Sequence, residues 1–130
     1  MRRWLKITPL MGLLLSACRA DGDLPPSYRA VRVPEERLAS SEARERGRRL
    51  FLEHCALCHG VEADGRGVRR EGLSSPPRDF TDPTVRRKLT PRRMYFAIRE
   101  GVRDTAMPSW KALDEGQTWD LVAFLRSVAR

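Results

Sequence analysis

Apolar residues recur at helical spacing in three segments of the chain, over residues 41–54, 91–100 and 115–128. No segment alternates apolar and polar residues as a half-buried strand does. Between the first two segments lies a long stretch dense in Gly and Pro, GVEADGRGVRREGLSSPPRDFTDP, which predicts an extended loop. The pattern therefore predicts a small all-α domain in which three main helices are joined by long loops.

Capping residues mark where each of these helices begins. Ser40 or Ser41 suits the N-cap of the first helix, because a hydroxyl oxygen accepts from the free amides of the first turn. Thr90, followed by Pro, suits the second helix, and a Gly follows its last residue. Asp114 with Gln117 three residues later forms a capping-box pattern for the third.

The first residues of the chain have the pattern of an export signal. MRRWLK is positively charged, and ITPLMGLLLSA is an apolar run shorter than the roughly 20 residues that span a bilayer. Leu15 to Cys18 resembles a bacterial lipobox, which implies a signal peptide over residues 1–17 and a lipid on Cys18. An ordinary cleavage site near Ala20 is the alternative. The expected location is outside the cytoplasm, facing the periplasm, with the inner or the outer membrane left open.

Residues 18–39 are polar, contain three prolines and show no helical or strand period. They predict a lipidated, flexible tether of about 21 residues, which would span roughly 25 Å as a coil and ~65 Å when extended. The folded domain is then expected over residues 40–130. No segment of the mature chain is apolar enough to predict a transmembrane helix.

The composition is that of a soluble domain with a basic charge, since 32% of the 130 residues are charged and the formal net charge is +8. Removal of Arg2, Arg3 and Lys6 with the signal lowers the net charge to +5. Export argues against nucleic acid as a partner. The segment VRRKLTPRR, residues 85–93, is a solvated basic face or a docking surface for an acidic redox protein.

The stretch HCALCHG, residues 54–60, carries the chemistry of the chain. Zinc is disfavoured because a structural site needs four ligands and no second Cys pair exists. A thioredoxin-like pair is disfavoured because it requires a βαβ context. Cys-x-x-Cys-His is the attachment signature of c-type haem, in which Cys55 and Cys58 form thioethers and His59 binds the iron. One covalent haem c is the expected cofactor.

The second axial ligand is narrowed by elimination. His54 lies on the same helical turn as the cysteines and does not reach the opposite haem face. Met94 falls within a helical apolar stripe, where methionine usually belongs to the core. Met107 lies outside any predicted helix, next to a proline and 48 residues after His59. Met107 is therefore the expected ligand, with Met94 and an open site as alternatives.

Five segments in order resemble the class I monohaem cytochromes c of bacteria: GRRLF, HCALCHG, SPPRDFTDP, IREGVRDTAMPSW and WDLVAFLRSV. The resemblance covers about residues 40–130 and implies the cytochrome c fold. It implies thioether bonds at Cys55 and Cys58 and axial ligation by His59 and Met107. It also implies that the carbonyl of Pro76 or Pro77 orients the His59 ring.

Further implications of this resemblance concern helix packing and the ligand loop. Gly47 and Phe51 match positions where the first helix crosses the last, around Leu121 and Phe124. Relatives commonly have Pro-Gly before the distal Thr-x-Met, whereas this chain has Arg-Asp at residues 103–104. That departure leaves the ligand loop less restrained than in the relatives.

Two functions follow for a haem site of this kind. Ligation by His and Met fills both axial positions and favours one-electron transfer, either as a membrane-tethered carrier or as the haem subunit of an oxidoreductase chain. The chain itself is then not an enzyme, and its partners are redox proteins. The alternative is a haem-based ligand sensor or peroxidase with a labile Met107 ligand, for which the Arg-Asp departure is the support.

Overall fold

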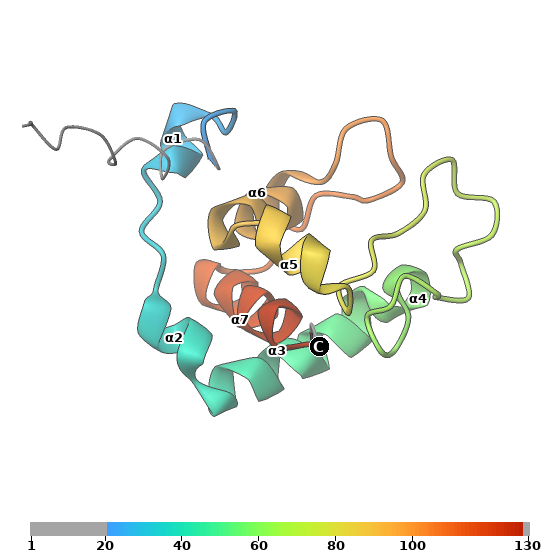
Figure 1. Cartoon of the computed structure of the whole chain (residues 1–130), viewed down its shortest axis with the longest axis horizontal. Coiled ribbons are helices and arrows are strands. Elements are labelled where there is room, and N and C mark those ends of the chain that lie inside the picture. Colours follow the sequence, from blue (N-terminus) through green and yellow to red (C-terminus); the bar gives the residue numbers. More distant parts are fainter. Residues whose placement is uncertain (1–20, 129–130) are drawn as a thin grey trace, which may run out of the picture.

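The computed structural model describes residues 21–128, which fold into helices joined by loops, with no strand among them (Figure 1). An all-α fold is thereby confirmed. The predicted signal peptide over residues 1–17 and the predicted lipidation of Cys18 lie outside the described residues. The helices are α1 (Pro26–Arg29), α2 (Glu35–Ala39), α3 (Ser41–His54), α4 (Ala56–His59), α5 (Pro83–Lys88), α6 (Pro91–Glu100) and α7 (Glu115–Ser127).

The three long helices begin where the sequence predicted. Ser40 is the N-cap of α3 and accepts a hydrogen bond from the Ala43 amide at 3.2 Å. Thr90 caps α6 in the same way, and Asp114 with Gln117 forms a complete capping box at α7. These caps satisfy first-turn amides that have no partner within the helix.

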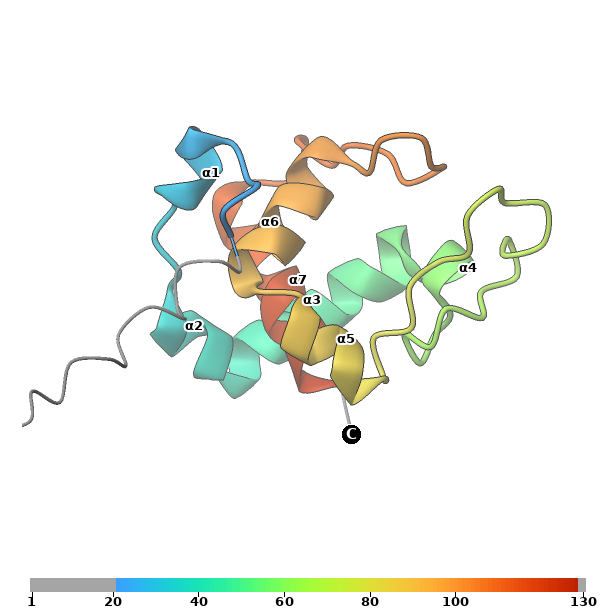
Figure 2. The same ribbon diagram turned by 45° about the horizontal axis from the view of Figure 1, so that its top comes forward.

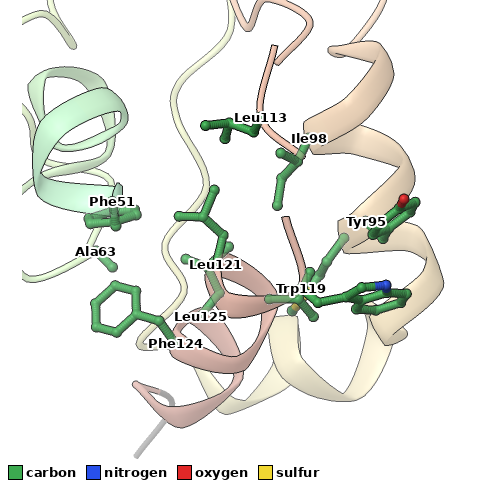
Figure 3. Close-up of a cluster of buried hydrophobic side chains, with 11 residues drawn as sticks. Phe51, Ala63, Tyr95, Ile98, Leu113, Trp119, Leu121, Phe124 and Leu125 are labelled. Atoms are coloured by element: carbon green, nitrogen blue, oxygen red, sulfur yellow. The ribbon is translucent and has the colours of Figure 1, made fainter. Parts of the chain in front are cut away.

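Helices α3 and α7 make the most extensive contact between elements and cross at the predicted positions. A Cβ on Gly47 would overlap the backbone of Asp120 and lie 3.0 Å from the Cβ of Phe124. Only glycine allows so close an approach. The rings of Phe51 and Phe124 pack with centroids 5.1 Å apart and join these helices to the core (Figure 3).

The first described residues correct one prediction. Residues 18–39 were expected to form a flexible tether, but residues 21–39 contain α1 and α2 and lie along the folded domain (Figure 2). Leu24 is buried at 6% exposure, and Leu38 packs against the core cluster. We call residues 21–39 the N-terminal clasp. Its helices have four and five residues, so contacts with distant residues stabilise them rather than helix propensity.

None of the helices in the described part of the chain has the length and apolar character needed to cross a bilayer. The two long loops, over residues 60–82 and 101–114, extend from the same side of the molecule, away from α1 and α2 (Figures 1 and 2). The candidate functional residues lie near these loops.

Candidate cofactor site

A cavity of about 480 Å³ lies between α3, α4, α6 and the two long loops. This volume falls within the roughly 300–1,000 Å³ usual for small-molecule and cofactor sites. Its walls are largely apolar and aromatic, and all four residues predicted to bind the haem, by thioether bond or to the iron, line it. The lining includes the following residues: Cys55, Cys58, His59, Arg78, Met94, Met107 and Trp110.

The two cysteines lie at the junction of α3 and α4. The Cys55 amide donates to the Phe51 carbonyl at 2.8 Å, and the His59 amide donates to the Cys55 carbonyl at 2.9 Å. The backbone therefore stays helical through the motif and places both thiols on one short turn. They are not joined in a disulfide, and both line the cavity.

The Gly-rich turn after the motif fixes the end of α4. The amides of Gly65 and Gly67 donate to the carbonyls of His59 and Cys58 at 2.8 and 3.1 Å. A side chain at Gly67 would overlap the backbone of Leu57 and Cys58. The segment DGRG, residues 64–67, is therefore a turn that holds the motif in place.

His59 is oriented by a carbonyl, as expected, but the carbonyl belongs to a different residue. Nδ1 of His59 lies 3.3 Å from the Arg78 carbonyl oxygen, one residue beyond Pro77. The accepting carbonyl was expected to belong to Pro76 or Pro77. Both prolines line the cavity, but neither accepts this hydrogen bond. The Pro77 carbonyl faces Gly65, where a Cβ would lie 2.6 Å from its oxygen. No side-chain pattern could have identified Arg78, because a backbone carbonyl carries no sequence signal.

Burial favours the neutral form of the groups at both ends of the motif. It lowers the pKa of His59, and the Arg78 carbonyl opposes this shift in part. The imidazole is thus neutral at physiological pH, the form that binds a metal ion, with Nε2 as its remaining donor. Burial, with a smaller contribution from Cys58, raises the pKa of Cys55 to about 12.

Met107 is held by a compact loop between α6 and α7. The Val102 amide donates to the Met107 carbonyl at 3.2 Å, and the Met107 amide donates to the Thr105 hydroxyl at 3.2 Å. The Trp110 amide returns to the Ile98 carbonyl of α6 at 2.9 Å. These bonds place the half-buried Met107 in the cavity wall.

Met94 also contributes to this wall, but from within α6. It is 4% exposed and belongs to the core cluster. A thioether on a helix in the core is the arrangement expected for packing. The two methionines therefore differ in their position in the fold: Met94 lies within a helix, and Met107 lies in a loop.

The departure from the relatives falls on a strained residue. Asp104 has a φ of 60°, the left-handed conformation that glycine adopts without cost. This is the position at which relatives commonly have glycine. Because Asp is among the few other residues that tolerate this conformation, the loop keeps its turn.

The basic segment is partly neutralised by the clasp. Arg92 pairs with Asp21 at 3.3 Å, and Arg93 pairs with Asp23. The three basic residues of the last turn of α5, residues 86–88, are exposed. The basic segment is therefore not one uniform surface. Arg92 and Arg93 pair with the clasp, and residues 86–88 face the solvent.

The donor set fits a covalent haem. Two thiols one turn apart, a neutral imidazole and a thioether line one largely apolar cavity. Within residues 21–128, no three His, Cys, Asp or Glu side chains come together as a metal site.

Comparison with known proteins agrees with this donor set. Residues 42–125 match the family model described as cytochrome C oxidase, cbb3-type, subunit III. No curated protein sequence matches the chain. A chain of the Kuenenia stuttgartiensis reducing HAO-like protein complex is similar in structure, with a TM-score of 0.57 and 28% sequence identity. The match covers 65% of the present chain and 42% of that one.

Proposed function

The chain belongs to the cytochrome c family described as cytochrome c oxidase, cbb3-type, subunit III, and it carries covalent haem c. We propose that it transfers single electrons through this haem, with a histidine and a methionine as the two iron ligands. The bound haem supplies a one-electron Fe(III)/Fe(II) couple. Cys55 and Cys58 hold it in the cavity, and His59 and Met107 are the proposed axial ligands. The observation that carries this proposal is that all four side chains line one cavity.

The protein's contribution is to position these groups and limit access to them. The Arg78 carbonyl orients the imidazole through Nδ1, which leaves Nε2 as the donor. The loop bonded to α6 presents the Met107 thioether, a soft ligand that favours the reduced iron. With His59 and Met107 both bound to the iron, an external ligand would find no open coordination position.

The proposal also includes location and partners. The lipobox-like sequence supports a lipid anchor at Cys18 and a position facing the periplasm, on the inner or the outer membrane. The partners are proposed to be redox proteins of a respiratory chain with acidic docking surfaces. The exposed basic residues 86–88 support this choice, because complementary charge raises the association rate.

Visible spectroscopy of the exported holoprotein tests the ligation. We expect a sharp reduced α-band and, in the oxidised protein, the far-red band of a methionine–iron bond. Met107→Ala should abolish the far-red band and lower the reduction potential. Met94→Leu should retain the far-red band and leave the reduction potential unchanged. Loss of the band in Met94→Leu alone would reverse the assignment.

Added carbon monoxide separates electron transfer from ligand sensing. The wild-type ferrous protein should keep its spectrum, whereas Met107→Ala should bind carbon monoxide rapidly. A fast spectral change in the wild-type protein would favour a sensor or peroxidase with a labile ligand.

A further inference from the structure

We propose that the N-terminal clasp keeps the anchored haem domain within a short distance of its membrane, so that its electron partner must also lie at that membrane surface. The inference rests on the proposed lipid anchor at Cys18. It deepens that proposal by favouring a fixed position beside a membrane-bound redox protein over a long-range shuttle. Three separate contacts of the clasp carry it.

The first contact joins the start of the clasp to α6. Asp21 accepts a hydrogen bond from the Thr90 hydroxyl and pairs with Arg92 at 3.3 Å. The same guanidinium donates from Nε to the Val31 carbonyl at 2.8 Å. Arg92 therefore binds two points of the clasp that are ten residues apart in the sequence.

The second contact packs a half-buried aromatic side chain of α1, Tyr28, against α6. The ring of Tyr28 packs edge-on against Phe96 at a centroid distance of 4.7 Å and lies 6.2 Å from Tyr95. Its hydroxyl donates to the Glu100 carboxylate. This contact therefore attaches α1 to the C-terminal half of α6.

The third contact joins α2 to α7. Arg37 donates to the Asp120 carboxylate at 2.8 Å and to the Gly116 carbonyl at 3.2 Å. Asp120 is 3% exposed, so this bond ends in the interior of the domain. The clasp is thus attached at its beginning, middle and end.

These contacts shorten the connection between lipid and haem domain. Only three Cα–Cα steps separate Cys18 from Asp21, which span at most about 11 Å. A released clasp would allow the roughly 65 Å expected of a flexible tether of this length. The first contact of the clasp is also close in sequence to the cavity wall. Asp21 binds Thr90, and the nearby residues Leu89 and Arg93 line the cavity.

Energy transfer from lipid to haem measures this distance. The mature holoprotein is reconstituted in phosphatidylethanolamine–phosphatidylglycerol vesicles that contain a lipid with a fluorescent headgroup, whose emission the haem quenches. The release variant combines Asp21→Ala, Leu24→Ser and Tyr28→Ala, because the contacts of Asp21 alone would keep the start of the clasp on α6. The matched control combines Ser27→Ala with Arg29→Ala, two exposed positions of the same segment. Insertion of about 20 Gly and Ser residues before Asp21 adds roughly 25 Å of coil and calibrates a long connection.

Wild type and control should quench strongly, and the release variant should fall to the level of the insertion variant. Amide hydrogen exchange should rise in residues 21–39 of the release variant while protection in α7 is retained, which separates release from unfolding. If amide exchange rises in residues 21–39 but the release variant quenches as strongly as wild type, the inference about distance is overturned. The proposed lipid anchor and electron transfer would then still stand. Vesicles that bind no protein would overturn the lipid anchor, and the inference with it, while leaving electron transfer intact.

Discussion

Gly47 of α3 lies directly against the backbone of Asp120 of α7, so closely that no side chain fits between the two helices. In an exposed helix, Gly→Ala stabilises by about 1 kcal/mol through helix propensity. Here the added methyl group must displace a backbone carbonyl, and Gly47→Ala should lower the free energy of unfolding by about 3 kcal/mol. Urea unfolding followed by circular dichroism measures the change.

The matched control for this prediction is Arg48→Ala, which truncates an exposed side chain on the same helix. Its unfolding free energy should stay within about 0.5 kcal/mol of wild type. A Gly47→Ala protein as stable as wild type would show that the two helices are not in close contact.

The Asp120 side chain supports a second prediction. Its buried carboxylate accepts from Arg46 Nε at 2.7 Å and from Arg37 at 2.8 Å. Asp120→Ala should cost about 1.5–3 kcal/mol, because it removes the charge-assisted hydrogen bonds to two half-exposed guanidinium groups. Arg37→Ala should cost much less, since Arg46 still pairs with the carboxylate. Equal losses in both variants would contradict this assignment.

Sequence reasoning succeeded where the signal was local. The caps at Ser40, Thr90 and Asp114 depend on residues within one turn, and the spacing from Cys55 to His59 is written directly in the chain. These features were predicted because the residues that determine them are adjacent in the sequence.

The clasp was missed because its order depends on distant partners. Tyr28 and Glu100 are separated by 72 residues, and Arg37 and Asp120 by 83. Polar, proline-containing sequence without a period is the usual pattern of a tether. The Arg78 carbonyl was missed for a different reason, because backbone oxygens are identical at every residue.

The strained Asp104 supplies a third prediction. Asp104→Gly should raise the free energy of unfolding by about 0.5–1 kcal/mol, because glycine adopts a φ of 60° without strain. The far-red methionine–iron band should also persist to higher urea concentration. Arg103→Gly is the matched control in the same loop, and it should destabilise slightly through backbone entropy. A loss of stability in Asp104→Gly would show that the aspartate side chain stabilises this turn.

The hydroxyl of Tyr28 makes the clasp sensitive to alkaline pH. Burial, and then the hydrogen bond to Glu100, raise the pKa of Tyr28 to about 12 from an ordinary value of 10.0. A pKa that is higher in the folded state favours the protonated phenol, so its stabilisation is fully present below pH 10 and is lost as the pH rises toward 12. Limited proteolysis of residues 21–39 should therefore accelerate across this interval. In Tyr28→Phe, which retains the ring packing but has no hydroxyl, cleavage should be faster at neutral pH and rise less between pH 10 and 12. The same steep rise in both proteins would assign the alkaline transition to another group.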